Sequence, residues 1–227
     1  MSTITKLNLL TETDAESNDT AAPSVQPDYT LTLPKAVFQL HRFASKDENR
    51  TALNNVRITQ HGPQAARTFI ATATDGHRLC TVEFTAADTD DCGLFPSDVL
   101  IPASILNSTR PKAKLTSGVL SGTGDVLSVQ TGELSGTFDK AGEWRFPDTQ
   151  QVIPPRGARD GVACRVAAFN LHYLADLAAM CKSCGERNIA PELSWPAHNL
   201  EPLRADVQLG GCDVVYVQMP MALGREK

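Results

Sequence analysis

Two short patterns in the sequence contain residue types that could do chemistry, and neither pattern is complete. Asp75 and His77 could act as an acid–base pair, but no nucleophile or oxyanion-binding loop accompanies them, and a tight turn accounts for their spacing. Cys181 and Cys184 have the Cys-x-x-Cys spacing of zinc and redox sites, yet zinc needs two further ligands and no second pair follows. The two cysteines could equally pack at the end of a helix. We therefore expect no catalytic centre, no metal site and no cofactor.

A pattern of positive charge is more informative, because it lies on one side of a predicted helix. Residues 34–46 (PKAVFQLHRFASK) begin with a proline at the favoured first helical position and place apolar residues at steps of three and four. The opposite side carries polar residues at the same spacing, namely Lys35, Gln39, Arg42 and Lys46. Further cationic residues follow the next predicted helix, namely Arg110, Lys112 and Lys114. Both groups could form a local cationic face, although a polar helix face is often only solvated.

The composition is that of a globular protein with an acidic leader. The chain has 227 residues, of which 41% are hydrophobic and 21% charged, and its formal net charge is −5. Residues 1–29 hold one Lys against five Asp and Glu, a net charge of −4, so the remainder is nearly neutral. This leader is poor in large apolar residues, which predicts disorder. No apolar stretch could span a membrane, no secretory signal opens the chain and the cysteines are not densely spaced, so we expect a cytoplasmic protein with reduced thiols.

The elements that must position these residues follow one order three times, about 60–65 residues apart. Each copy is a strand, a helix and three strands. The first copy has a strand at 29–33, the helix at 34–46 and strands at 54–60, 67–73 and 78–84. The second has a strand at 98–102, a helix at 103–110 and strands at 114–120, 125–131 and 133–139. The third has a strand at 162–169, a helix at 171–183 capped by Asn170 and strands at 190–195, 203–209 and 214–220. Two copies could complete one compact domain, which leaves the third without a partner inside this chain.

Four segments then resemble one known family, the bacterial DNA sliding clamp, which is the beta subunit of DNA polymerase III. ATDGHRLC at 73–80 is similar to ATDGHRLA in the family's middle domain, and RFPDTQQVIP at 145–154 is similar to its end-of-domain segment FPDYxRVxP. FNLHYLADL at 169–177 resembles the opening of its last half-domain, and YVQMPMAL at 216–223 resembles its terminal YVxMPMRL. The resemblance implies an α+β sliding-clamp fold of repeated β-α-β-β-β half-units, with helices on one face of antiparallel sheets.

The resemblance also implies a division of the chain. Residues 30–155 correspond to the family's middle domain and residues 156–227 to the second half of its last domain, after the leader at 1–29. The family's first domain and the other half of the last one have no counterpart here. Two family chains close a ring of twelve half-units, so chains with three half-units each could close a ring of four.

Two sites follow from the resemblance. Helices line the central hole of the clamp, which implies that the two cationic groups described above face duplex DNA. An apolar pocket receives short peptides from partner proteins, and the matching positions are Leu53, Thr74, Gly76, His77, Arg78, Leu79, Pro147, Val152, Val217, Met219, Pro220, Met221 and Leu223. Methionine suits such a pocket because its thioether chain repacks at little cost. Gln151 and Ala222 stand where the family usually has arginine, which puts the polar contacts at the rim in doubt.

The function that the resemblance implies is that of a non-catalytic processivity factor of DNA replication. Its partners would be duplex DNA, DNA polymerase and repair proteins, a clamp loader and further copies of itself. The alternative is an interaction module of clamp ancestry that keeps the pocket but does not encircle DNA. Residues 6–10 (KLNLL) are similar to the QLxLF-type peptides that clamp pockets receive, although chance readily explains so short a match.

Overall fold

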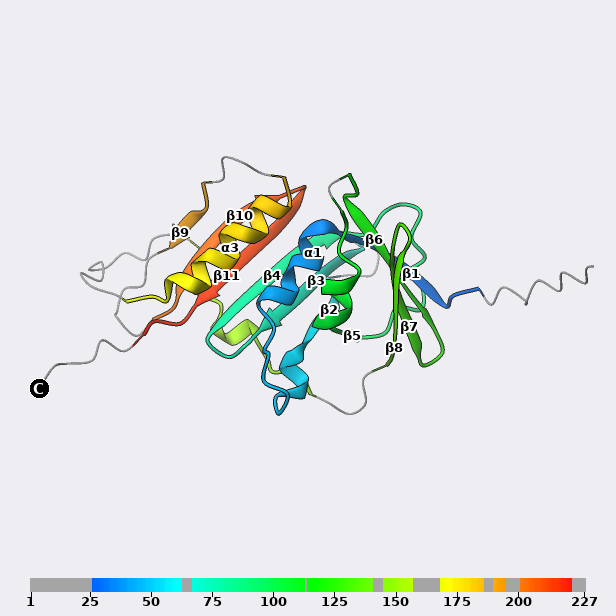
Figure 1. The fold of residues 1–227 in the computed structure, drawn as a ribbon, viewed down its shortest axis with the longest axis horizontal. Helices are drawn as coiled ribbons and strands as arrows, with labels where there is room; N and C mark the ends of the chain where they lie inside the picture. The colour runs from blue at the N-terminus through cyan, green and yellow to red at the C-terminus, as the bar shows by residue number, and fades with distance from the viewer. Residues whose placement is uncertain are drawn as a thin grey trace, which may run out of the picture.

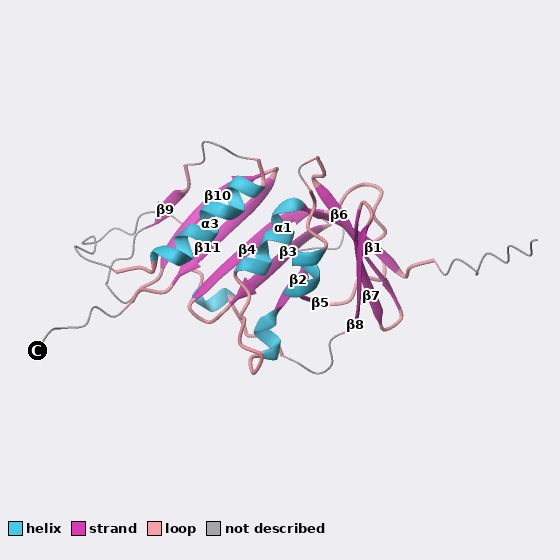
Figure 2. Cartoon of the chain, in the orientation of Figure 1, coloured by secondary structure: helices cyan, strands magenta, loops and turns pink. Residues whose placement is uncertain are grey.

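The computed structural model of this chain describes residues 26–62, 67–112, 114–140, 145–156, 168–185, 190–194 and 201–221. Within these residues the chain forms antiparallel sheets with short helices lying against them (Figures 1 and 2). The α+β class that the sequence predicts is thereby confirmed. No described helix has the length and apolar character needed to cross a membrane.

Three units follow one another along the chain, each with a helix followed by a run of strands. The first unit comprises β1 (Tyr29–Pro34), α1 (Lys35–Gln39), η1 (Leu40–Arg42), η2 (Thr51–Asn54), β2 (Asn55–His61), β3 (Thr68–Thr74) and β4 (Arg78–Thr85). The second comprises β5 (Asp98–Pro102), α2 (Ala103–Ser108), β6 (Ser117–Thr123), β7 (Val126–Thr131) and β8 (Leu134–Asp139), and a closing segment with η4 (Gln150–Val152) follows it. The third comprises α3 (Leu171–Ser183), β9 (Glu192–Ser194), β10 (Leu203–Leu209) and β11 (Cys212–Gln218).

The first two units complete each other by exchanging their leading strands. β5 of the second unit pairs antiparallel with β2 of the first, with Ile101 opposite Val56. β1 of the first unit pairs antiparallel with β6 of the second, with Leu31 opposite Leu120. Each exchanged strand lies beside the first long strand that follows a helix, where an uncovered edge would leave N–H and C=O groups unpaired. The two units therefore depend on each other to finish their sheets.

The third unit extends the sheet of the first. β11 pairs antiparallel with β4, with Val214 opposite Val82 and Gln218 opposite Arg78. The larger sheet thus has the strand order β5-β2-β3-β4-β11-β10-β9, and the smaller sheet has the order β1-β6-β7-β8. Figure 1 shows α1, α2 and α3 on the same face of the larger sheet. All three helices cover the apolar side of one continuous sheet.

Helix α1 is shorter than the sequence predicts. The predicted helix runs over residues 34–46, whereas the α-helix ends at Gln39 and a 3-10 turn continues only to Arg42. The Arg42 carbonyl accepts a hydrogen bond of 2.7 Å from the Arg78 guanidinium, and the Phe43 N–H donates to the Leu40 carbonyl at 2.9 Å. These bonds replace those that would have lengthened the α-helix. The predicted apolar face is nevertheless buried, namely Ala36, Val37, Leu40, Phe43 and Ala44.

The other two helices follow their predictions closely. Helix α2 ends at Ser108, shortly before Pro111. Helix α3 spans the predicted residues, and the Asn170 side chain accepts a 3.0 Å hydrogen bond from the His172 N–H, which is the predicted N-cap. The predicted strand at 162–169 lies outside the described residues except at its end, where Ala168 bridges to Met221.

Candidate functional site

An apolar pocket of about 320 Å³ opens where the third unit joins the first. Its lining comes from the β3–β4 turn and β4, from the closing segment after the second unit, and from the end of β11. The lining residues are Leu53, Thr74, Gly76, Arg78, Leu79, Pro147, Asp148, Thr149, Val152, Val217 and Met219. All of these except Asp148 and Thr149 are positions that the sequence resemblance implied. The structure therefore brings residues from distant parts of the chain around one cavity.

Some implied positions lie elsewhere. His77 stacks its ring on Tyr173, with ring centroids 6.5 Å apart, and its carbonyl accepts the Met219 N–H at 2.9 Å, so it supports the pocket wall through its backbone. Pro220 and Met221 do not line the cavity, because the chain leaves it after Met219. The Met221 N–H instead donates a 2.8 Å hydrogen bond to the Ala168 carbonyl. Leu223 and Ala222 lie outside the described residues.

Two lining residues, Asp148 and Thr149, were not anticipated from the sequence. Both lie between Pro147 and Val152 in the segment at 145–154, and their neighbours in that segment were the signal that could have identified them. Asp148 accepts a 2.9 Å hydrogen bond from the Gln151 side-chain amide. Gln151 therefore orients a carboxylate at the pocket rim, where the family usually has an arginine.

A fixed turn presents β4 to the pocket. Gly76 has φ +92, a left-handed conformation that glycine adopts without strain. The Thr74 hydroxyl donates to the Arg78 carbonyl at 2.7 Å and accepts the Gly76 N–H at 3.1 Å. Asp75 accepts the backbone N–H groups of His77 and Arg78 at 2.9 and 3.1 Å. Because the Asp75 carboxylate bonds backbone groups of the turn, it serves the turn's geometry and gives no support to an acid–base pair with His77.

Arg78 ties the first unit to the third. Its guanidinium bonds Asp75 at 3.0 Å within the turn, Asp176 of α3 at 2.6 Å and the Arg42 carbonyl at 2.7 Å. It also lies over the Tyr173 ring, 4.4 Å from the centroid. Burial by itself lowers the pKa of Arg78, but the bonds to Asp176 and Asp75 outweigh it, so the pKa is raised. Arg78 therefore stays positively charged and makes one ion pair within the first unit and one with the third unit.

Apolar groups at the pocket rim remain open to solvent. Met219 is 41% exposed and Val152 is 47% exposed, whereas Leu79 and Val217 form a buried wall. Large apolar side chains left exposed around a hollow are typical of a surface that another molecule covers. The arrangement can hold apolar side chains beside a few hydrogen-bonding groups.

Several cationic residues of the first two units lie where the two units meet. The turn η1, which carries Arg42, contacts helix α2, which Arg110 follows. Burial lowers the pKa of His41, its hydrogen bond with the Phe38 carbonyl raises it, and the charges of Arg42 and Arg110 lower it further. The Lys35 N–H donates to the Thr116 carbonyl at 2.8 Å, so the start of α1 adjoins the segment that carries Lys112 and Lys114. Lys46 is exposed beyond η1. These six cations (Lys35, Arg42, Lys46, Arg110, Lys112 and Lys114) form what we call the basic surface.

One residue assigned to that surface from the sequence was assigned wrongly. Gln39 is only 2% exposed and accepts a 3.2 Å hydrogen bond from Nε of Arg42. Helix α1 also buries Phe38, the residue beside it, because the helix packs against more than one neighbour and not only against the sheet. Gln39 therefore orients Arg42 and cannot itself reach a phosphate.

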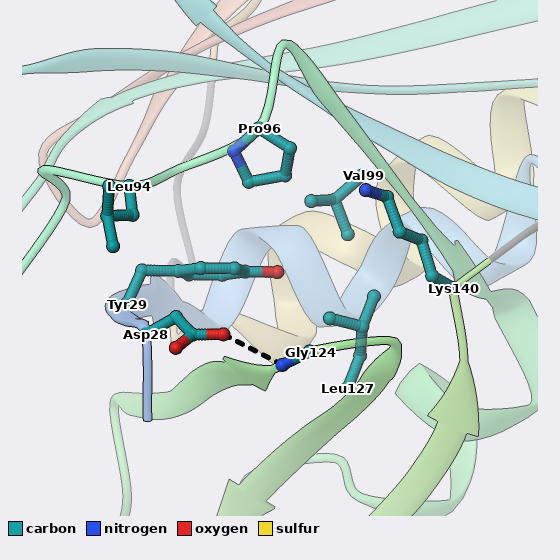
Figure 3. A pocket seen from close by; sticks show the side chains of 8 residues that line it. All are labelled: Asp28, Tyr29, Leu94, Pro96, Val99, Gly124, Leu127 and Lys140. Carbon is teal, nitrogen blue, oxygen red and sulfur yellow. Dashed lines mark hydrogen bonds between the residues drawn. The ribbon is translucent and has the colours of Figure 1, made fainter. Parts of the chain in front are cut away.

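A second cavity, of about 160 Å³, is lined by the start of β1, the segment that leads into β5, and the hairpin strands of the second unit (Figure 3). The Tyr29 hydroxyl points into it, and no described group bonds that hydroxyl. Gly122 makes room for the ring, since a Cβ there would lie 2.4 Å from it. Burial, together with the nearby Asp28 charge, raises the pKa of Tyr29 to about 12. The Asp28 carboxylate bonds the Gly124 N–H at 2.7 Å.

The cysteines give no support to a metal centre. Among the residues that the structure describes, no three His, Cys, Asp or Glu side chains gather as metal ligands. Cys181 is buried on the side of α3 that packs against the sheet, and the Cys80 thiol lies 4.0 Å from the Met180 sulfur. Burial raises the pKa of the Cys80 thiol strongly, which keeps it protonated and unreactive.

No protein-family model and no curated protein sequence matches this chain. Solved structures do. The sliding clamp (DNA polymerase III subunit beta) from Bartonella birtlesii, bound to griselimycin, has a TM-score of 0.63 at 18% identity, over 89% of this chain and 68% of that one. The clamp from Caulobacter crescentus gives 0.60 at 18% identity, over 88% and 68%. The clamp from Bacillus subtilis gives 0.60 at 14% identity, over 90% and 68%. The chain therefore has the sliding-clamp fold, as the resemblance implied.

Replacing Arg78 with Ala should lower the free energy of unfolding by about 3 kcal/mol, because two carboxylates and a carbonyl lose a buried cationic partner. Denaturant unfolding followed by circular dichroism measures this. Arg156→Ala is the matched control, since Arg156 makes an exposed ion pair with Glu192 and its loss should change little. Equal effects of the two substitutions would refute the role given to Arg78.

Removing the hydroxyl should change the free energy of unfolding differently at the buried residues Tyr29 and Tyr216. Tyr29→Phe should leave the free energy of unfolding unchanged or raise it, because the hydroxyl has no described partner. Tyr216→Phe should lower it by about 1–2 kcal/mol, because the Tyr216 hydroxyl donates to the buried Gln218 side chain at 2.7 Å. Thermal and urea unfolding of both variants would check the contrast, and a loss at Tyr29 as large as at Tyr216 would contradict it.

Proposed function

We propose that this chain is a DNA sliding clamp, a non-catalytic cytoplasmic processivity factor that tethers DNA polymerase and repair proteins to duplex DNA. The observation that carries the proposal is the apolar pocket at the junction of β4 and β11. Its walls come from the first unit, the closing segment and the third unit. The sliding-clamp fold supports the proposal, because the pocket lies where segments similar to the family's conserved motifs meet.

The pocket suits a short linear peptide. Leu79 and Val217 offer an apolar floor for a leucine or phenylalanine anchor, and the exposed Met219 can repack around different side chains. Thr149 and the Asp148 carboxylate lie at the edge, where they can meet peptide N–H groups. A volume of about 320 Å³ is near the lower end for ligand pockets, which fits one or two anchor side chains.

The basic surface suits the phosphate backbone. Contacts from Lys and Arg to phosphates give affinity by releasing counterions and carry no base preference, which is what a protein that slides along DNA requires. Helices α1 and α2 lie on the same face of the larger sheet, so the cations in α1 and in the segments that follow both helices can meet one duplex. Closure around DNA further requires a clamp loader and the association of several chains. With three half-units in each chain, four chains would supply the twelve half-units of a clamp ring.

A second candidate function is an interaction module that uses the pocket without encircling DNA. Asp176 favours it, because its carboxylate bonds the Arg78 guanidinium, which also bonds the Arg42 carbonyl, so a carboxylate lies near the basic surface. A negative charge at that place weakens attraction to phosphates. Such a module would bind or compete for the partners of another clamp.

Topological retention on DNA separates the two functions. The protein is loaded on nicked circular DNA with a bacterial clamp loader and ATP, and the DNA is then linearised. A clamp should stay on the circular DNA through a high-salt wash and slide off the ends of the linear DNA, whereas a simple binder should bind both forms equally.

Lys112→Glu should lower the slope of DNA affinity against salt concentration by the equivalent of roughly one to two phosphate contacts. Lys140→Glu, which makes the same charge change beside the second cavity, is the control and should not.

Met219→Ala should weaken binding of a fluorescein-labelled QLxLF-type peptide by about tenfold or more, because the pocket loses the side chain that would cover the peptide's anchor residue. Fluorescence anisotropy measures the dissociation constant. Met221→Ala is the matched control, since Met221 is similarly exposed at 53% but does not line the cavity. Full affinity of the Met219→Ala variant would disprove the pocket assignment.

A further inference from the structure

Among the described residues, nothing covers one flank of the third unit, whereas the first two units cover the corresponding flanks of each other. In the first two units, the edge of the first long strand after each helix is covered by a leading strand of the other unit, β5 on β2 and β1 on β6. In the third unit the corresponding strand is β9. Within the described part of the chain, β9 pairs with β10 and ends the larger sheet on its other side. Among the described residues, no strand therefore occupies the edge of β9, the position that β5 fills beside β2 and β1 fills beside β6.

Helix α3 is apolar on the side that faces away from the first unit. Its other side meets the first unit through Tyr173 and Asp176, which contact Arg78. Leu171, Ala175 and Ala178 are exposed and lie one helical turn apart along the helix, and Leu171 is 76% exposed. No carboxylate interrupts this stripe. Small residues at its centre permit a second helix to approach closely.

The open strand edge and the apolar helix side belong to one surface. Leu193 of β9 is 42% exposed and lies opposite the buried Ala205 of β10, so both side chains are on the sheet face that α3 covers. Figure 1 shows β9 as the outermost strand beside α3, on the side away from α1. We call the surface formed by Leu171, Ala175, Ala178 and Leu193 the α3 flank.

We propose that the α3 flank binds the α3 flank of a second copy of this chain about a two-fold axis. The fold itself argues for this occupant, because every covered flank in the chain is covered by another unit of the same kind, with α1 against α2 and exchanged strands at both edges. A unit that has no fellow in its own chain finds an identical one in a second copy. Two-fold pairing uses one surface twice and requires no further component.

The pairing gives Leu171 a defined environment. In an antiparallel pair of α3 helices centred between Ala175 and Ala178, Leu171 of one copy lies against the aliphatic stem of Lys182 of the other. The pairing would supply one of the two kinds of contact that a ring of four chains needs, and to that extent it rests on the proposed function. Association itself can be measured without DNA.

The experiment measures the mass of the full chain by sedimentation and light scattering from about 1 to 200 μM, a range that covers micromolar association. The wild-type chain should form dimers or a multiple of dimers. Leu171→Lys should raise the dissociation constant at least 100-fold, because each copy would then hold an ammonium group beside Lys182 of the other copy in an apolar contact. Leu94→Lys is the matched control, since Leu94 is similarly exposed at 71% but lies beside the second cavity, and it should leave the mass unchanged.

A strictly monomeric wild-type chain would overturn the inference, and so would dimers that Leu171→Lys leaves intact. Circular dichroism and peptide binding should be unchanged in Leu171→Lys, because Leu171 is exposed and does not line the pocket. That control also separates the two proposals. Dimers without topological retention on DNA would defeat the clamp function and leave the α3 flank pairing in place.

Discussion

The antiparallel pairing of β4 with β11, fixed by the buried guanidinium of Arg78, is the constraint on which the rest of this molecule depends. It joins the third unit to the first, and it brings Val217 and Met219 beside Leu79 to create the apolar pocket. Arg78 satisfies carboxylates from two units and a carbonyl at the end of η1, so separating the units would leave several buried charged or polar groups unpaired. The joint and the binding surface are therefore one structure.

Incomplete units explain the architecture around that joint. A strand–helix–three-strand unit cannot cover its own sheet edge, so the first two units exchange β1 and β5 and become a single body. The third unit meets the same demand on one side only, through β11. Its remaining flank, with the β9 edge and the exposed Leu171, is where we propose that a second copy binds. Leu171 does not line the pocket, so the two surfaces have no residue in common.

Local sequence patterns predicted those elements whose local preferences agree with their environment. The tight turn at Asp75 and His77, the Asn170 cap of α3 and the strands predicted at 54–60, 67–73 and 78–84 were correct. The prediction was wrong where the environment was not the simple one assumed. Helix α1 has neighbours on more than one side, so Gln39 is buried although its position in the helical period is on the polar side. The Tyr29 cavity had no signal at all, because it arises where three separate segments fail to fill a space.

By itself, the sequence determined the three repeated units, the basic residues and most of the pocket-lining positions, since those follow from periodicity and from segments similar to one family. Tertiary structure alone decided how the third unit attaches, why Arg78 is buried, and which edge remains open. The physical reason is that the hydrogen-bonding groups at a strand's edge belong to the backbone and are the same for any side chains. Every strand offers the same N–H and C=O groups, and only the arrangement of the other strands determines which edges are covered.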